Sequence, residues 1–330
     1  MDDYVPAAWW AGGHRMTVFT WARPRRFPGL PRPSARLFRV SPDTQVLAHC
    51  HWQADPRSCP TLVALHGLEG SSSAHYMRGM AHKALARGFN VVLLNQRNCG
   101  GTDHLSPGLY HSGLTADPAA VIRELIEVDG LRSIAVAGYS LGGNVAVKLA
   151  GDYGEACPPE VRSVCAISPT LELAACTLLL ERRENRIYEW NFLRSLKARM
   201  RRKQRLFPDR YSTDGLRSIR SIRVFDDRIT APHNGFEGAA DYYYRASAMR
   251  VVDRIRISTL IISAKDDPFV PVEPLSAPEL AGNRHISTVI PAHGGHCGFV
   301  AEKPRGYDGY WAEQAVVAFS EEHAAVARQG

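Results

Sequence analysis

The sequence predicts an α/β protein built on a mostly parallel sheet with helices on both faces. Short apolar runs typical of buried strands alternate with helix-length segments along most of the 330 residues. One such run, residues 133–138, ends in Gly-x-Ser-x-Gly and passes at once into a helical segment. Two later strands end in loops that carry neighbouring carboxylates and neighbouring histidines, at the sheet edge where α/β proteins place their sites.

The predicted elements begin with an N-terminal segment, residues 1–34, which contains four prolines between positions 24 and 33. We expect this segment to be extended and to pack on the core, because proline disfavours regular structure. Residues 35–53 predict a two-stranded hairpin around Ser41-Pro42-Asp43-Thr44. The remaining strands are expected near residues 61–65, 90–96, 133–138, 161–167, 258–264 and 285–290.

The alternation of strands and helices stops once, between about residues 170 and 250. An insertion at this point of an α/β sheet is expected to cover the active site. We therefore predict a core formed by residues 35–169 and 251–330, with a cap formed by residues 170–250.

The Gly-x-Ser-x-Gly motif predicts a nucleophilic serine at a sharp turn between strand and helix. Ser140 would adopt a strained backbone conformation that presents its hydroxyl above the sheet edge. Gly138 and Gly142 flank it, because side chains there would collide with the neighbouring strand and helix. The free N–H groups and the dipole of the following helix lie beside the hydroxyl.

A serine nucleophile needs a base, and the base needs a carboxylate that orients it. After the apolar run 258–264 come Asp266 and Asp267, and we favour Asp267 because it directly precedes the proline turn. The Gly-rich loop after the last strand offers His293 and His296 as the base, and we favour His296. Taken singly, an Asp-Pro turn or a loop histidine has an ordinary structural explanation. Three such elements in the order Ser, Asp, His favour a catalytic triad.

Two backbone N–H groups are expected to form the oxyanion hole. Leu141 follows the nucleophile, and Leu68 belongs to a His-Gly turn after an early apolar strand. His66, Gly67 and Tyr139 are predicted to contact the substrate, His66 through its backbone only, because its side chain is typical of a structural turn histidine.

Further motifs resemble the YheT-like branch of the α/β-hydrolases, also called the alpha/beta-hydrolase-4 family. The resemblance runs through most of the chain. It rests on Gly13-His14-Arg15-Met16-Thr17, His66-Gly67-Leu68-Glu69-Gly70, Asn95-Gln96-Arg97-Asn98-Cys99-Gly100-Gly101, Tyr110-His111-Ser112-Gly113, Asp117, Phe225-Asp226-Asp227-Arg228-Ile229-Thr230, Gly235-Phe236, Asp241-Tyr242-Tyr243 and His293-Gly294-Gly295-His296.

The resemblance implies an α/β-hydrolase fold with a triad on Ser140, Asp267 and His296. Members of this family are mostly carboxylesterases or lipid-acyl hydrolases. In this chain Gln96-Arg97-Asn98 stands where relatives more often have Phe-Arg-Gly, and this difference bears on the shape of the acyl pocket.

We therefore expect a serine carboxylesterase that cleaves esters of short- to medium-chain acyl groups through an acyl-enzyme. An acyltransferase or a lipid-acyl hydrolase on the same fold is the nearest alternative. A catalytically idle scaffold, or a module that binds membrane surfaces, is the alternative from another class. Serine at the elbow argues against epoxide hydrolase or haloalkane dehalogenase chemistry, which uses aspartate there.

Composition favours a single globular enzyme without a cofactor. No apolar run approaches the ~20 residues that span a bilayer, and the N-terminus lacks the pattern of a signal peptide. The seven scattered cysteines indicate reduced thiols, so we expect a cytoplasmic protein. Neither zinc-ligand spacing nor a phosphate-binding loop is present, and we expect no metal and no nucleic-acid partner. The expected partner is a small ester or lipid substrate, and the chain is expected to be a monomer or homodimer.

Residues 181–210 carry eleven Arg or Lys and four Asp or Glu, a net charge that equals the +7 of the whole chain. Tyr188, Phe192, Leu196 and Met200 recur every four residues and predict an amphipathic helix. We favour a cap helix whose apolar face covers the acyl pocket and whose basic face is solvated. The alternative is a weak association with anionic membrane surfaces.

Overall fold

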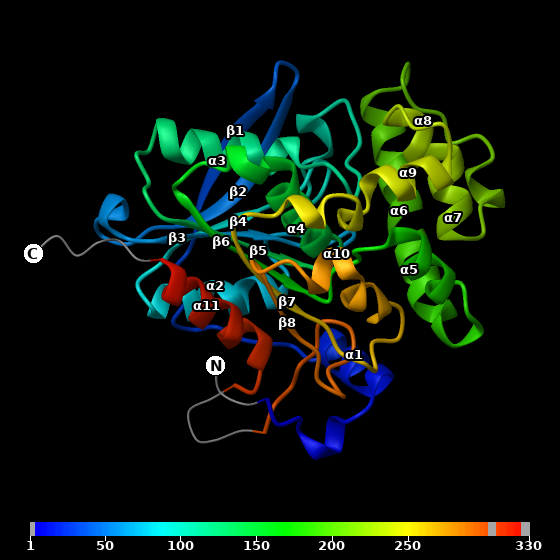
Figure 1. Ribbon diagram of the computed structural model, residues 1–330. Helices are drawn as coiled ribbons and strands as arrows, with labels where there is room; N and C mark the ends of the chain where they lie inside the picture. Colours follow the sequence, from blue (N-terminus) through cyan, green and yellow to red (C-terminus); the bar gives the residue numbers. More distant parts are fainter. Residues whose placement is uncertain (1–3, 303–307, 325–330) are drawn as a thin grey trace, which may run out of the picture.

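The computed structural model of the protein describes residues 4–302 and 308–324, and it contains an eight-stranded sheet in the order β1-β2-β4-β3-β5-β6-β7-β8 (Figure 1). The pairs β1–β2 and β2–β4 are antiparallel, and the other five pairs are parallel. The strands are β1 (Ser34–Ser41), β2 (Thr44–His51), β3 (Thr61–Leu65), β4 (Asn90–Leu94), β5 (Ile134–Tyr139), β6 (Val161–Ile167), β7 (Ser258–Ile262) and β8 (Ile286–Val289). Each lies within a residue or two of a predicted strand, so the predicted fold class is confirmed.

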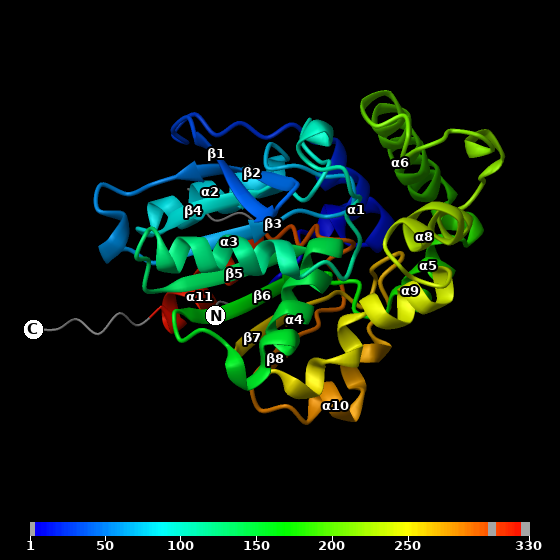
Figure 2. The same ribbon diagram turned by 90° about the horizontal axis from the view of Figure 1, so that it is seen from above.

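Helices cover both faces of this sheet (Figures 1 and 2). The helices are α1 (Gly13–Ala22), α2 (His75–Ala86), α3 (Ala116–Glu127), α4 (Leu141–Tyr153), α5 (Leu173–Leu180), α6 (Arg186–Leu206), α7 (Ile222–Phe225), α8 (Ala231–His233), α9 (Ala239–Ala246), α10 (Pro278–Ala281) and α11 (Trp311–His323). Helices α3 and α4 pack on one face with the side chains of Val63 and Val136, and α2 and α11 pack on the other with Leu62 and Ala64. The inner strands β3, β4 and β5 are buried along their full length, as expected for a parallel sheet covered on both sides.

The N-terminal segment differs from the prediction. We expected residues 1–34 to be extended, but α1 forms between residues 13 and 22. The prolines on which the prediction rested begin only at position 24, and their restriction on the backbone is local. Met16, Thr17 and Thr20 form the buried face of α1, so the segment packs on the core as a helix.

Helices α5 to α9 occupy the stretch between β6 and β7, where the cap was predicted, and lie at one end of the sheet (Figure 2). The long helix α6 buries Leu193, Leu196 and Met200 in a cluster of its own with Phe225. Tyr188, farther toward the N-terminus of α6, packs at the edge of this cluster.

The basic face of α6 is only partly solvated: Arg194 and Arg201 are exposed as we expected, but two other basic side chains are not. Arg199 and Lys203 are buried, and both reach across to the sheet domain. The ammonium group of Lys203 donates to the backbone carbonyls of Asp103 and Ser106. Arg199 forms an ion pair with Glu69 at 2.5 Å. These charges attach the cap to the core, a role that a count of charges along the sequence does not reveal.

We predict that Lys203→Met lowers the free energy of unfolding by about 1–3 kcal/mol, because two buried carbonyls lose their donor. Urea unfolding followed by circular dichroism measures the change. The matched variant Arg201→Met removes an exposed charge two residues away on the same helix and is expected to stay within ~0.5 kcal/mol of the parent protein. Equal losses in the two variants would contradict an anchoring role for Lys203.

Candidate active site

Ser140 stands at the turn between β5 and α4 in a strained backbone conformation. Its φ is 53° and its ψ is −117°, a combination that residues with a side chain rarely adopt. The turn is tight enough to require both flanking glycines. A Cβ on Gly138 would lie 2.1 Å from the carbonyl oxygen of Gly142, and a Cβ on Gly142 would lie 2.5 Å from the carbonyl oxygen of His66. The structure therefore has the geometry of a nucleophile elbow.

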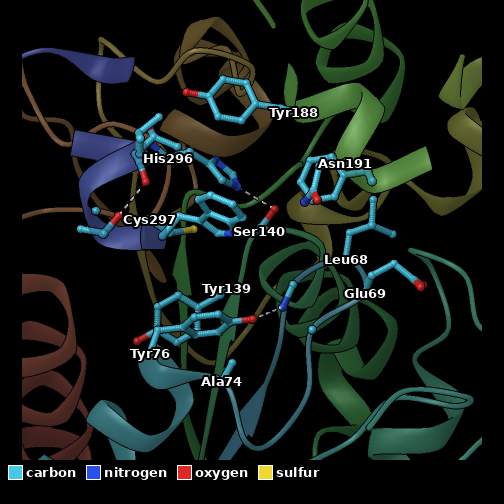
Figure 3. Close-up of a pocket in the computed structure, with 18 of the residues that line it drawn as sticks. Leu68, Glu69, Ala74, Tyr76, Tyr139, Ser140, Tyr188, Asn191, His296 and Cys297 are labelled. Atoms are coloured by element: carbon cyan, nitrogen blue, oxygen red, sulfur yellow. Dashed lines mark hydrogen bonds between the residues drawn. The ribbon is translucent and has the colours of Figure 1, made fainter. Parts of the chain in front are cut away.

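The hydroxyl of Ser140 lies 2.9 Å from Nε2 of His296 (Figure 3). On the other side of the ring, Nδ1 lies 2.9 Å from Oδ2 of Asp267. The second carboxylate oxygen of Asp267 accepts hydrogen bonds from the N–H groups of Phe269 and Val270. The carboxylate is therefore fixed from two directions, and Nδ1 must carry the proton of a neutral imidazole, because the carboxylate can only accept. This tautomer leaves Nε2 free to accept the proton of the serine.

The neighbouring pair, Asp266 and His293, makes different contacts. Oδ1 of Asp266 accepts from the N–H groups of Gly294 and Gly295, at 2.9 Å each, and Oδ2 contacts Nδ1 of His293 at 3.0 Å. His293 is half exposed and has no contact with Ser140 among the described residues. Asp266 thus shapes the loop that carries His296, and the geometry favours Asp267 and His296 as members of the relay.

Two opposing effects act on the pKa of His296. Burial disfavours the charged ring, whereas the sulfur of Cys297 and the carboxylate of Asp267 favour it. The favourable contacts prevail, and the pKa of His296 lies above its ordinary value. The ring of Phe269 covers the imidazole, with the two ring centres 4.1 Å apart, which limits access of water to the relay.

The loop after β3 brings its backbone N–H groups to the nucleophile. The N–H of Gly67 donates to the hydroxyl of Tyr76 and the N–H of Glu69 donates to the hydroxyl of Tyr110. The N–H of Leu68, between them, has no hydrogen-bond partner within residues 4–302 and 308–324, which suits a group that receives an oxyanion. In Figure 3, Leu68 and Ser140 lie on adjoining parts of the same site.

Glu69 connects this loop to the cap. Its backbone has a φ of 55°, and its carboxylate points away from Ser140 (Figure 3). The carboxylate accepts from the hydroxyl of Tyr110 at 3.0 Å and pairs with Arg199 of α6, whose guanidinium also lies over the Tyr110 ring. A buried pair of this kind is costly to break, because the remaining charge would be left without a partner. The conformation of this loop is thereby tied to the position of the cap.

His66 does not contact the substrate site through its side chain. The ring is fully buried: Nδ1 donates to the carbonyl of Gly67, and Nε2 accepts from the N–H of Gln96. Burial lowers the pKa of His66 to about 4, so the ring is neutral. Gly67 and Tyr139 line the cavity, whereas His66 is not among its lining residues, so a contact of its backbone with substrate stays a prediction. The buried ring of His66 has a structural role instead, because its hydrogen bonds hold two strand ends together.

The unusual Gln96-Arg97-Asn98 segment also acts behind the site. The side chain of Gln96 donates to the carbonyl of His66, and Arg97 forms a two-pronged ion pair with Asp117. Asn98 has a φ of 63°, a conformation that asparagine tolerates better than most residues. These three residues are not among those that line the cavity, so any effect on the acyl pocket would be indirect and stays a prediction.

Helix α1 supports the catalytic loops, a role that the sequence did not predict. Gly13 packs so closely on the Asp266 backbone that a Cβ would lie 1.7 Å from its carbonyl oxygen. The hydroxyl of Thr17 accepts the N–H of His296 at 2.8 Å and donates to the carbonyl of Gly13 at 2.7 Å. The Gly-His-x-x-Thr signature was the available signal, since it places a small residue and a hydroxyl on one turn of a helix.

A cavity of about 540 Å³ opens over the nucleophile. Ser140 and His296 lie in its wall together with Leu68 of the oxyanion loop, and the cap contributes Tyr188, Asn191 and Phe192 (Figure 3). Most of the lining is apolar, and the volume lies in the range typical of small-molecule sites. The arrangement is suited to holding an apolar acyl group beside an activated hydroxyl.

Comparison with known proteins agrees with this geometry. Residues 60–303 match the family described as alpha/beta hydrolase fold. The chain is 37% identical over 310 residues to the Escherichia coli (strain K12) protein named "Putative esterase YheT", covering 90% of this chain and 87% of that protein. The chain belongs to the α/β-hydrolase family.

Within this α/β-hydrolase family, the chain is of the YheT type. It is 28% identical over 264 residues to mouse "Phospholipase ABHD3", covering 80% of this chain and 62% of that protein. It is 27% identical over 255 residues to a Saccharomyces cerevisiae "Monoacylglycerol lipase", covering 74% of this chain and 56% of the lipase. The chain thus spans less than two thirds of either relative.

Solved structures show the same fold at low sequence identity. The Pyrococcus furiosus esterase Pf2001 superimposes with a TM-score of 0.60 at 15% identity, over 92% of this chain and 100% of that chain. Est1E from Butyrivibrio proteoclasticus, determined with ferulic acid bound, gives a TM-score of 0.57 at 16% identity, over 88% of this chain and 99% of that chain.

Among the residues that the structure describes, neither the pattern of a metal site nor that of a membrane-spanning helix is found. Within them, no group of three or more His, Cys, Asp or Glu side chains is arranged to hold a metal ion. A helix with the length and apolar character to cross a membrane is likewise missing from this part of the chain.

We predict that kcat/KM for a soluble ester rises with pH through a midpoint above 6.5, because the base must be neutral and the pKa of His296 is raised. Asp267→Asn is expected to move that midpoint to lower pH and to reduce kcat by roughly three to four orders of magnitude. The neighbouring variant Asp266→Asn is expected to shift the midpoint less, since its carboxylate contacts His293. A midpoint at or below 6.5 that Asp267→Asn leaves in place would contradict this assignment.

We also predict that Thr17→Val lowers kcat by about tenfold with little change in KM. Valine has nearly the same shape as threonine but lacks the hydroxyl that holds the loop carrying His296. Thr17→Ser keeps the hydroxyl and is expected to retain most of the activity. Steady-state kinetics of the two variants measure the difference. If the serine and valine variants were equally active, or equally impaired, the hydroxyl would not be the positioning group.

Proposed function

We propose that this protein is a serine carboxylesterase that cleaves carboxylic esters of short- to medium-chain acyl groups. The observation that carries the proposal is the chain of contacts from Ser140 through His296 to Asp267, at 2.9 Å for each step. The strained turn at Ser140 supports it, because strained backbone conformations cluster at active sites.

In the proposed reaction, Oγ of Ser140 attacks the ester carbonyl carbon while Nε2 of His296 accepts the hydroxyl proton. Asp267 holds the ring in the required tautomer and stabilises the imidazolium that forms. The protonated ring then donates its proton to the leaving alcohol as the tetrahedral intermediate collapses to an acyl-enzyme. Water, activated by the same ring, releases the acid and regenerates Ser140.

The negative oxygen of each tetrahedral intermediate is assigned to the N–H groups of Leu68 and Leu141. Leu141 is the first residue of α4, where a backbone N–H has no partner within the helix. Donors fixed before the reaction stabilise the developing charge without reorganisation, and loss of one such donor typically costs about 2.7–4 kcal/mol of transition-state stabilisation.

The substrate class follows from the cavity and from the relatives. The lining is mostly apolar, with the side chain of Phe269 against the His296 ring and Phe192 against Phe269. Relatives of the chain are named a putative esterase, a phospholipase and a monoacylglycerol lipase, which supports an ester or lipid substrate. A cavity of about 540 Å³ favours short and medium acyl chains over long ones.

Active-site labelling with a fluorophosphonate probe tests the proposal, together with hydrolysis of p-nitrophenyl esters from acetate to laurate. We predict that the parent protein is labelled and that turnover peaks at a short or medium chain length. Ser140→Ala is expected to lose both labelling and turnover. Ser195→Ala removes another serine of the same cavity, whose hydroxyl donates to Asn191 of its own helix, and is expected to keep the label.

A folded parent protein that takes up no probe would overturn the assignment of a serine nucleophile. Equal labelling of the parent protein and Ser140→Ala would move the nucleophile to another residue. Turnover that rises steadily to laurate would reject the proposed acyl length and leave the mechanism in place.

A further inference from the structure

The mouth of the cavity is rimmed by large apolar side chains that face solvent. Val18 and Trp21 come from α1, and Ile187 and Trp190 come from the first turns of α6. All four line the cavity, yet 46% of Val18, 71% of Trp21, 69% of Ile187 and 61% of Trp190 is exposed. We call these four residues the rim.

The rim joins two helices that are far apart in the sequence. Nδ1 of His14 in α1 lies 3.1 Å from the hydroxyl of Tyr188 in α6, and the two rings stack at 5.8 Å. The exposed side chains of both helices therefore belong to one continuous surface around the opening. Single exposed apolar residues are ordinary, but four that encircle one opening form a patch of the kind that marks an interaction site.

The two stretches of sequence that carry the rim have a large excess of exposed positive charge. Residues 11–26 and 181–194 contain seven exposed arginines, and the only exposed acidic side chain in these two stretches is Glu184. The guanidinium of Arg194 lies over the ring of Trp190, 5.2 Å from its centre. Tryptophan beside arginine is typical of segments that lie at the boundary between lipid headgroups and acyl chains.

We infer that the rim docks on an anionic lipid surface, so that an ester lipid passes from the membrane into the cavity without crossing water. The two tryptophans and the two aliphatic side chains would enter the headgroup region, while the surrounding arginines pair with lipid phosphates. This inference rests on the proposed function, because docking would deliver an ester for hydrolysis. The evidence for the docking itself is the exposed rim.

The structure also changes which residues are expected to carry such an interaction. The sequence analysis gave membrane association through the whole segment 181–210 as the alternative, but Arg199 and Lys203 are buried in contacts with the core. The docking surface is instead the start of α6 together with α1, which has three exposed arginines in or near it (Arg15, Arg23 and Arg26).

Flotation with lipid vesicles tests this docking. The full chain carrying Ser140→Ala is mixed with vesicles of phosphatidylcholine alone or with 30% phosphatidylglycerol, so that binding is measured without turnover. We predict binding to the anionic vesicles that weakens with salt. The double variant Trp21→Ser/Trp190→Ser is expected to bind at least tenfold more weakly, and Arg186→Gln about fivefold more weakly.

Leu206→Ser provides the matched control. Leu206 is 46% exposed on the same helix, roughly 24 Å along it from Trp190 at 1.5 Å per residue, and its loss is expected to leave binding unchanged. A thermal melt of each variant shows whether it is folded. If the double variant does not fold, the Arg186→Gln variant tests the same surface.

Several outcomes would overturn the inference. It fails if folded protein floats with neither vesicle, or if Leu206→Ser weakens binding as much as the rim variants do. Self-association that the rim variants abolish, seen by analytical ultracentrifugation without lipid, would instead assign the rim to a second copy of this chain. None of these results affects the esterase proposal, which is judged by probe labelling and by hydrolysis of soluble esters.

Discussion

The backbone conformation of Ser140 is the constraint on which the rest of the site depends. A φ of 53° at a residue with a side chain is unfavourable by itself, so neighbouring groups must hold it in place. Because Gly138 and Gly142 have no Cβ, the strand and helix approach more closely than a side chain at either position would allow. The hydroxyl reaches His296 only because the turn lifts it above the sheet, and the helix that follows begins with a free N–H at the same point.

A buried ion pair joins the loop after β3 to the cap. Glu69 lies next to the proposed donor Leu68, and its carboxylate is held by Tyr110 of the core and Arg199 of the cap. Since Arg199 is 3% exposed, moving α6 away would leave an unpaired carboxylate beside the site. The cap therefore contributes to the arrangement of the site as well as to the shape of the cavity.

The fold was largely predictable because strands leave a strong local pattern. Runs such as Thr61–Leu65 and Ile134–Tyr139 are buried throughout and mostly apolar, as expected for strands inside a parallel sheet. The elbow, Asp267 and His296 could be named because each follows a strand in a known order, and their catalytic roles stay predictions. Helix α1 and the buried charges of α6 escaped prediction for a common reason. Their meaning depends on contacts with residues more than 80 positions away, such as Thr17 with His296 and Lys203 with Asp103.

Gly13 packs closely on Asp266, although the two residues belong to distant parts of the chain. The segment that defines the family in this chain runs from residue 60 to residue 303 and includes all three residues of the relay. It leaves out α1, whose Gly13 and Thr17 hold the loop that carries His296. A protein trimmed to that segment would keep Ser140, Asp267 and His296 and lose the helix that supports their loops. Removal of α1 is therefore expected to act on the proposed site without removing any of its three side chains.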